Sequence, residues 1–274
     1  MAETDKLFTG SIPEVYDHFL VPLIFESYAN DLAERVARLK PQAVLETAAG
    51  TGVLTRALVS RLASDRSLTV TDLNQPMLDR AMARHAAVLS SGDRIEWRQA
   101  DALALPFGDE AFDVVACQFG AMFFPDKVNG YREAHRVLKP AGCFLFNVWD
   151  EIAANEFAHT VTEALAVLFP RDPPLFMART PHGYHDLGII HDALRAAGFT
   201  SVTAETLRGI SKAASARDAA IAYCQGTPLR NEIEARDAAG LEDATQRVAE
   251  ALAQRFGNGP IEGRIRAHVI TATR

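Results

Sequence analysis

The sequence predicts a three-layer α/β/α sandwich that has a mostly parallel, seven-stranded sheet and a helical cap. Short apolar or β-branched runs alternate with segments of helical spacing, which is typical of βαβ units. The segment 112–119 reads as one apolar run, as expected of a strand buried on both faces. A chain of 274 residues that is 48% hydrophobic and 23% charged can also bury a sizeable core.

The strands of this sheet are expected in seven short ranges. In chain order they are 43–47, 67–74, 95–98, 112–119, 143–149, 201–207 and 264–273. Helical spacing predicts helices at 54–62, 76–89, 128–138 and 187–197. Pro76 suits the first turn of the second helix, Pro140 and Gly142 end the third, and Gly198 closes the fourth.

The chain is expected to form a single domain over 1–274. Its core is expected to comprise the sheet and helices of about 36–150, 186–210 and 262–274. Three segments lie outside this alternation, at 1–35, 151–185 and 211–258, and we expect them to form the cap. The last of these contains the stripe Ala244, Val248, Leu252 and Phe256, whose four-residue spacing predicts a packed helix face.

Charge and hydropathy exclude some classes of function. The net charge of -7 argues against a broad nucleic-acid interface, which needs a basic face to neutralise phosphates. No apolar stretch reaches the length of about 18 residues that a membrane span requires, and nothing marks the N-terminus for export. We therefore expect a cytoplasmic protein that acts on a small molecule, with a homodimer left open. The three cysteines are far apart and predict no disulfide or zinc site.

A candidate ligand site follows the first predicted strand. The Gly50-Thr51-Gly52 turn between a strand and a helix points backbone N–H groups toward the carboxyl ends of parallel strands, where ligands bind in open α/β sheets. A lone GxG turn is weak, because nucleotides of several kinds use it.

Acidic residues narrow the choice of ligand. Thr55 stands where a dinucleotide fingerprint requires Gly or Ala. Glu46 at the end of the strand would repel a pyrophosphate, whereas a ligand with a sulfonium and an ammonium group would be attracted. Asp72 and Asp101 follow the next two strands. Three acids around one crevice favour a cationic nucleoside over an anionic dinucleotide.

At this point the sequence resembles the class I methyltransferases, which are Rossmann-like and use S-adenosylmethionine. It is specifically similar to the ubiquinone/menaquinone-biosynthesis C-methyltransferase group. The resemblance runs from about Val44 to Val148 through VLETAAGTGVLT, TVTDLNQPMLDRA, WRQADALALPFGDEAFDVVACQFGAMFF and YREAHRVLKPAGCFLFNVW. One departure is Ala48, which stands where the group usually has a first glycine.

The resemblance implies a set of cofactor-binding residues. Glu46, Ala48, Gly50, Thr51 and Gly52 would line the methionine end. Asp72 would accept hydrogen bonds from both ribose hydroxyls. The adenine would be flanked by Leu73 and Met77 and bound by Asp101 and the Ala102 N–H, while Gln118 would face the methionine or the acceptor. Taken without the resemblance, Asp72 is equally well a helix N-cap and Asp101 a turn former.

Other candidates are proposed for contact with the cofactor or for proton transfer. In the N-terminal segment, Tyr28 or Tyr16 would touch the cofactor, although helix amphipathicity also explains these aromatics. Asp150, His182 and His185 are the candidate bases. The cluster HGYHD is also explained by a loop with Asp186 as helix cap, and we assign no metal site.

The predicted function is methyl transfer from S-adenosylmethionine to a small, apolar or aromatic acceptor by in-line displacement, with S-adenosylhomocysteine as product. The apolar segment 119–124 suggests the acceptor class, although it is equally good core. Two alternatives stay open. They are a nicotinamide-dependent oxidoreductase and a non-catalytic protein that binds S-adenosylmethionine.

Overall fold

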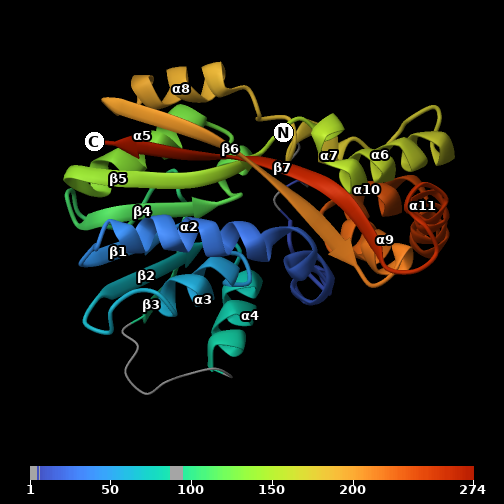
Figure 1. Cartoon of the computed structure of the whole chain (residues 1–274), viewed down its shortest axis with the longest axis horizontal. Helices are drawn as coiled ribbons and strands as arrows, with labels where there is room; N and C mark the ends of the chain where they lie inside the picture. The colour runs from blue at the N-terminus through green and yellow to red at the C-terminus, as the bar shows by residue number, and fades with distance from the viewer. Residues whose placement is uncertain (1–4, 6, 87–94) are drawn as a thin grey trace. The chain divides into compact units, whose positions relative to one another are not determined.

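The computed structural model describes residues 5, 7–86 and 95–274 (Figure 1). The described chain divides into two compact units. Unit 1 comprises 1–26, 149–184 and 207–267, and unit 2 comprises 27–148, 185–206 and 268–274. The turn that carries the candidate site belongs to unit 2. The single domain and the cap stay predictions.

One sheet of seven strands runs through the described residues in the order β3-β2-β1-β4-β5-β7-β6 (Figure 1). Its strands are β1 (Ala43–Glu46), β2 (Ser67–Asp72), β3 (Ile95–Gln99), β4 (Phe112–Gln118), β5 (Leu138–Trp149), β6 (Ser201–Ala213) and β7 (Ile261–Thr273). The pairs β3-β2, β2-β1, β1-β4 and β4-β5 are parallel. This confirms the predicted mostly parallel seven-stranded sheet.

Unit 2 has helices on both faces of its part of the sheet. Register aligns Glu46 with Ala116 and Ala116 with Leu145, so these three side chains share one face. Thr55 of α3 (Val53–Val59) bonds Glu46 on that face. On the opposite face, Tyr131 of α5 (Lys127–Val137) contacts Phe144 and Phe146, the alternate residues of β5. Sequence alternation along β5 therefore produces the three layers.

Two further helices of unit 2 lie close to their predicted ranges, namely α4 (Gln75–Ala86), with Pro76 in its first turn, and α8 (Leu187–Ala196). Unit 2 also contains the short 3-10 turn η3 (Ala121–Phe123) and most of α2 (Glu26–Arg38), a helix in the segment that the sequence assigns to the cap. The Asp186 side chain caps α8 by accepting from the N–H groups of Gly188 and Ile189. Residues 87–89, expected at the end of α4, lie outside the described residues.

Unit 1 contains most of the helices that the sequence places outside the core. They are α1 (Ile12–Val15), the π-helical η2 (Tyr16–Phe25), the 3-10 turn η4 (Ile152–Ala154), α6 (Glu156–Leu168), α7 (Phe176–Arg179), α9 (Ala216–Gln225), α10 (Leu229–Arg236) and α11 (Leu241–Phe256). The predicted stripe on α11 packs inward, because Ala244, Val248 and Leu252 are fully buried and Phe256 contacts Phe157 edge to face.

Two strands differ from the predicted bounds by more than three residues. β5 begins at Leu138 rather than Cys143, since Leu138 pairs with Phe112 across a register shift in β4. β6 continues to Ala213, into the segment expected to be helical, because pairing within the sheet overrides local propensity. Both differences come from pairing with distant strands.

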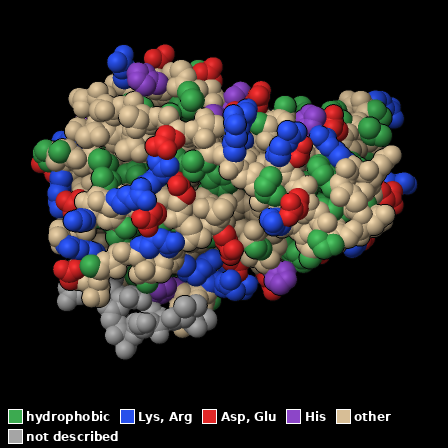
Figure 2. All heavy atoms as spheres, viewed as in Figure 1, with side chains coloured by type: hydrophobic (Ala, Val, Ile, Leu, Met, Phe, Trp, Pro, Cys, Tyr) green, Lys and Arg blue, Asp and Glu red, His purple; other side chains and the backbone are tan. Residues whose placement is uncertain are grey.

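Surface charge, the thiols and the apolar character of the helices add three observations. Figure 2 shows Lys/Arg and Asp/Glu side chains interspersed on the face in view, without a broad basic area. Cys117, Cys143 and Cys224 are all free of disulfides. Within the described ranges, no helix combines the length and the apolar character that crossing a membrane requires.

Candidate functional site

The turn from β1 to α3 has three residues in the left-handed region. Ala48, Gly50 and Gly52 have φ angles of 52°, 56° and 77°. Backbone bonds hold the turn to its neighbours, since Ala49 N–H donates to the Thr71 carbonyl and Thr47 N–H to the Ala116 carbonyl. Glycine adopts this conformation freely, whereas Ala48 adopts it at a cost of about 1–2 kcal/mol. The chain therefore keeps an alanine in a turn whose conformation favours glycine.

The Cβ of Ala48 lies against a second glycine. A Cβ built on Gly120 would stand 2.4 Å from the Ala48 Cβ and 2.8 Å from the Cys117 Sγ. Gly120→Ala should therefore lower the free energy of unfolding by about 2 kcal/mol through overpacking. Adding Ala48→Gly should recover at least about 1 kcal/mol of that loss, because it removes the contact with the Ala48 Cβ and the left-handed alanine, while the contact with the Cys117 Sγ remains. Chemical denaturation measures both effects.

A matched control for this prediction is Gly108→Ala. A Cβ at Gly108 meets nothing within 4 Å, so its substitution should be close to neutral. If Gly120→Ala is as mild as Gly108→Ala, or if the double variant is no better than the sum of the two single changes, then the contact between Ala48 and Gly120 does not constrain the turn.

Glu46 ends β1 as a carboxylate buried beneath this turn. Its side chain is 1% exposed, and its Oε2 accepts a 2.7 Å hydrogen bond from the Thr55 hydroxyl. Its Oε1 is buried without a hydrogen-bond partner among the described residues. Burial raises the pKa of Glu46 to about 8, although the Thr55 hydrogen bond opposes the shift. A buried carboxylate oxygen that lacks a partner is suited to a cationic ligand group.

Asp72 ends β2 next to the same turn. Its Oδ2 accepts from the Gly50 N–H at 2.8 Å, and its Oδ1 accepts from the Asn74 N–H at 2.7 Å. Burial raises the pKa of Asp72, while these backbone N–H groups favour its charged form. A carboxylate has about four acceptor positions, of which the Gly50 and Asn74 N–H groups each occupy one. The carboxylate also fixes Gly50, which sequence reasoning did not predict.

The predicted adenine residues have unequal surroundings. Met77 of α4 is buried, whereas Leu73 is 44% exposed directly after β2. Asp101 is exposed after β3, and its Oδ1 accepts from the Leu103 N–H at 2.9 Å as a turn former does. Ala102 is half-buried in that turn. Asp101 therefore acts as a turn former in this structure, and its contact with adenine stays a prediction.

Aromatic and amide groups lie at the end of β4. Gln118 is half-buried and stands opposite Asn147 of β5. Tyr28 of α2 is buried and contacts Phe119 edge to face, with 5.5 Å between ring centroids. Burial raises the pKa of Tyr28, so its hydroxyl stays neutral at physiological pH. Glu46, Asp72, Gln118 and Tyr28 all belong to unit 2, together with the turn.

The candidate bases are divided between the units. In unit 1, the Asp150 carboxylate pairs with Arg266 and accepts from the Glu151 N–H. The buried His182 ring places Nδ1 2.9 Å from the Asp150 carbonyl oxygen. Because a carbonyl only accepts, Nδ1 carries a hydrogen in this contact. His185 is half-buried and belongs to unit 2, while Tyr16 stacks on Phe25 within unit 1.

Similarity to known proteins shows the family to which this chain belongs. The profile described as the ubiE/COQ5 methyltransferase family matches residues 10–213, which include the turn, Asp72 and all of β4 and β5. The chain belongs to the ubiE/COQ5 methyltransferase family. This confirms the family that the motifs between Val44 and Val148 predict.

Relatives and solved structures agree with this family and fold. The ubiquinone/menaquinone biosynthesis C-methyltransferase UbiE of Cereibacter sphaeroides is 29% identical over 167 residues, which cover 58% of this chain and 66% of that protein. The similarity thus spans just under two thirds of this relative.

Two solved structures share the fold at low sequence identity. Phosphoethanolamine N-methyltransferase 2 of Haemonchus contortus, solved with S-adenosyl-L-methionine, is 16% identical with a TM-score of 0.60, covering 100% of this chain and 60% of that chain. The YcgJ protein of Bacillus subtilis is 17% identical with a TM-score of 0.57, covering 90% and 98%. These likenesses establish the fold alone.

Within this ubiE/COQ5 family member, sequence reasoning missed several site residues. The sequence singles out Thr55 only as a non-glycine, whereas its hydroxyl donates to Glu46. The Asn147 amide, which the sequence analysis does not name, has no hydrogen-bond partner among the described residues. Asn147 has a sequence signal, because it is a polar residue inside the apolar run CFLFNVW. The bond from Thr55 has none.

A lysine holds the segment that follows β4 in this family member. The Lys127 ammonium donates to the carbonyl oxygens of Met122 at 2.9 Å and Phe124 at 2.5 Å. Burial lowers the pKa of Lys127 to about 8. These contacts fix the backbone that carries Phe119, Met122 and Phe124, whose side chains are buried.

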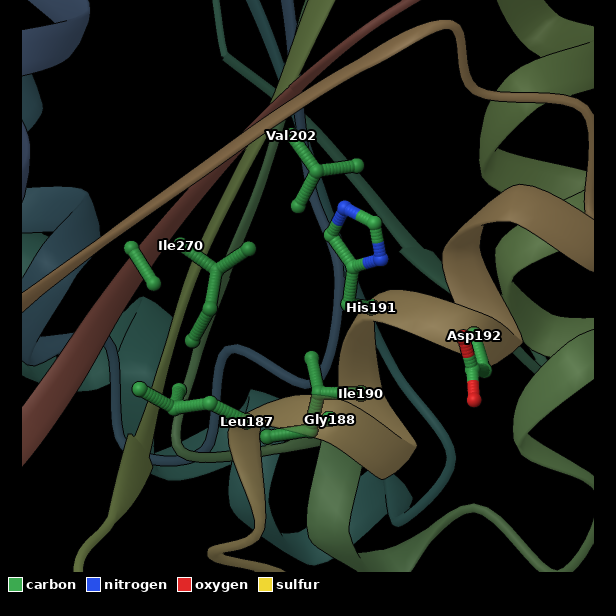
Figure 3. A pocket seen from close by; sticks show the side chains of 8 residues that line it. Leu187, Gly188, Ile190, His191, Asp192, Val202 and Ile270 are labelled. Atoms are coloured by element: carbon green, nitrogen blue, oxygen red, sulfur yellow. The ribbon is translucent and has the colours of Figure 1, made fainter.

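Unit 2 also has a separate hollow of about 340 Å³ between α8 and strands β6 and β7 (Figure 3). Its lining is mostly apolar and includes Leu187, Ile190, Val202 and Ile270, and Figure 3 shows the His191 ring reaching from α8 toward Val202. Its lining includes neither the turn nor a predicted site residue, so the hollow is not part of the candidate site.

Proposed function

We propose that this protein transfers a methyl group from S-adenosylmethionine to a small-molecule acceptor. The observation that carries the proposal is the Oε1 atom of Glu46, a buried carboxylate oxygen that lacks a hydrogen-bond partner among the described residues. A dinucleotide would bring its pyrophosphate toward this carboxylate, which is electrostatically unfavourable, whereas a sulfonium or ammonium group gains from it. Family membership supports the same cofactor.

The residues of unit 2 fit this cofactor. Glu46, Ala48, Gly50, Thr51 and Gly52 would hold its methionine end. The Thr51 hydroxyl, which has no hydrogen-bond partner in the described part of the chain, adds a polar group there. Asp72 would bind the ribose. Leu73, Met77, Asp101 and Ala102 would surround the adenine, with Tyr28 and Gln118 on the methionine side.

When bound, S-adenosylmethionine supplies a methyl group on a sulfonium, which is an excellent leaving group. Catalysis by this chain then consists of holding the acceptor in line with that methyl, at about 3 Å, and excluding water. We propose a small apolar or aromatic acceptor, because the ring of Phe119 and the Met122 and Phe124 side chains make the end of β4 apolar. A preference for strongly charged acceptors in a competition assay contradicts this acceptor class.

An acceptor that must lose a proton needs a base, and we propose His182. Its Nδ1 is held by the Asp150 carbonyl, so in the neutral ring the lone pair is on Nε2. Asp150 is the second candidate, although its carboxylate already pairs with Arg266. His185 is the third. A cytoplasmic location and a homodimer likewise stay predictions.

The proposal is tested with S-adenosylmethionine that carries a tritiated methyl group and a fractionated cell extract. We expect the label to appear in one small compound when the purified protein is present. His182→Ala should lower kcat for that compound by about 100-fold or more without changing affinity for S-adenosylhomocysteine. His185→Ala serves as the comparison.

Two results contradict the proposal. Stabilisation by NADH or NADPH, but not by S-adenosylhomocysteine, would indicate an oxidoreductase. Tight binding of S-adenosylmethionine without transfer of its labelled methyl group to any extract fraction would indicate a protein that binds the cofactor and does not catalyse.

A further inference from the structure

Asn147 is a buried amide near the C-terminal end of the apolar strand β5. Its side chain is 0% exposed, and both Oδ1 and Nδ2 have no hydrogen-bond partner among the described residues. Its neighbours Phe146 and Val148 are also fully buried. Buried polar atoms in folded proteins are nearly always paired, because a buried atom without a partner has lost its hydrogen bonds to water and gained none within the protein. The Asn147 amide therefore destabilises the folded protein, which indicates that the residue has a functional rather than a structural role.

Asn155 shows how the same residue behaves in a structural role. It is 3% exposed, and its Nδ2 donates to the carbonyl oxygens of Asp150 and Glu151 at 3.2 and 3.0 Å. Its Oδ1 accepts from the Arg266 N–H at 3.0 Å. The chain thus contains one buried asparagine whose amide is fully paired and one whose amide is not.

The register of the sheet brings Asn147 to the candidate site. Asn147 lies opposite Gln118, and both are two residues beyond the row that joins Glu46, Ala116 and Leu145. Since side chains alternate along a strand, Glu46, Gln118 and Asn147 share one face at the carboxyl ends of β1, β4 and β5. Phe119 N–H donates to the Asn147 carbonyl at 3.2 Å, which ties this strand end to the segment after β4.

The order of the strands places Asn147 on the side of the site from which the methyl acceptor would approach. The proposed cofactor residues end β1 and β2, with the ribose at Asp72 and the methionine end at Glu46. The acceptor must approach from the side away from the ribose, over β4 and β5. This inference rests on the proposed function, because it assumes that S-adenosylmethionine occupies the turn.

We propose that the Asn147 side chain binds the methyl acceptor. An amide offers one acceptor and one donor group side by side, which matches a group that both donates and accepts a hydrogen bond, as a hydroxyl does. Asn147 thereby selects acceptors that carry a hydroxyl on an otherwise apolar body. The apolar surroundings strengthen the selection, because an acceptor without such a group leaves the amide unpaired.

Asn147→Val separates this role from a structural one, since valine has a similar size and suits a buried strand. For the ligand-free protein we expect its Tm to rise by about 3 °C, as loss of an unpaired amide predicts. The matched control Asn155→Val should lower Tm instead, because it breaks three hydrogen bonds. S-adenosylhomocysteine should bind Asn147→Val within about twofold of wild type by calorimetry.

Methyl transfer by each variant is measured with tritiated S-adenosylmethionine and the extract fraction that the wild-type protein labels. Asn147→Val should lose at least about tenfold in label transfer, mostly as a higher KM. A lower Tm for the ligand-free variant, a large loss of S-adenosylhomocysteine affinity, or unchanged transfer would each overturn the inference. Failure of wild type to bind S-adenosylhomocysteine would remove the proposed function itself, whatever the two asparagine variants do to Tm.

Discussion

The affinity of this protein for S-adenosylmethionine should fall about tenfold for each pH unit as pH is lowered from 8 to 6. The pKa of Glu46 is raised to about 8 by burial, so below that pH the ligand-free carboxyl carries a proton. A cationic ligand needs the ionised form, and binding must release the proton. Calorimetry in two buffers of different ionisation enthalpy measures that release.

Glu46→Gln is the control for this pH dependence. It keeps the shape of the side chain but cannot ionise, so affinity should drop by about 30- to 100-fold at pH 8 and lose its pH dependence. The stability of the ligand-free wild type should fall as pH rises, whereas its affinity for the ligand should increase. The folded Glu46 binds a proton between pH 4.5 and about 8 that the unfolded residue does not, so wild type loses stability as pH rises through this window.

Glu46→Gln should lack that loss and unfold at a higher temperature than wild type at pH 8. A wild-type affinity that is constant from pH 6 to 8 would show that Glu46 does not face the cation. Retention of affinity by Glu46→Gln would lead to the same conclusion.

Asp72→Ala should weaken binding of S-adenosylhomocysteine by at least about 30-fold, or roughly 2 kcal/mol. The variant removes the carboxylate that is proposed to bind the ribose. It also removes the acceptor of the 2.8 Å hydrogen bond that the Gly50 N–H donates to the Asp72 Oδ2. Calorimetric titration of the variant measures the loss. Unchanged affinity would remove Asp72 from the cofactor site.

Asp113→Ala is the matched control, because it also removes a carboxylate that binds backbone N–H groups of the sheet. The Asp113 Oδ2 accepts from Gln42 N–H at 2.9 Å and Ala43 N–H at 2.8 Å, at the start of β1 rather than its end. We expect this variant to lose stability and to keep its affinity within about twofold. Equal weakening in both variants would attribute the effect of Asp72→Ala to loosening of the sheet.

Local sequence signals predicted the strands better than their ends. Strands β1 to β4 lie within about two residues of the predicted ranges, since apolar runs bounded by turn residues are local features. The start of β5 at Leu138 depends on its pairing with Phe112, and the extension of β6 to Ala213 depends on the sheet. Pairing between distant segments has no local signal.

The candidate site shows the same division. Glu46 and Asp72 were predicted because carboxylates at strand ends beside a glycine turn limit the ligand. The bond from Asp72 to Gly50, the hydroxyl of Thr55 on Glu46 and the closeness of Gly120 to Ala48 arise only when the turn is folded. Asp150 is a candidate base because it follows the fifth predicted strand, and His182 and His185 are candidates because they belong to the polar cluster HGYHD; all three remain proposals.

The central claim is that the turn at Gly50 holds S-adenosylmethionine, and calorimetric titration of the wild-type protein tests it most directly. S-adenosylhomocysteine and NADH are titrated side by side at pH 8. The proposed site predicts one S-adenosylhomocysteine bound per chain, with no measurable heat from NADH under the same conditions. Saturable binding of NADH without binding of S-adenosylhomocysteine would contradict it.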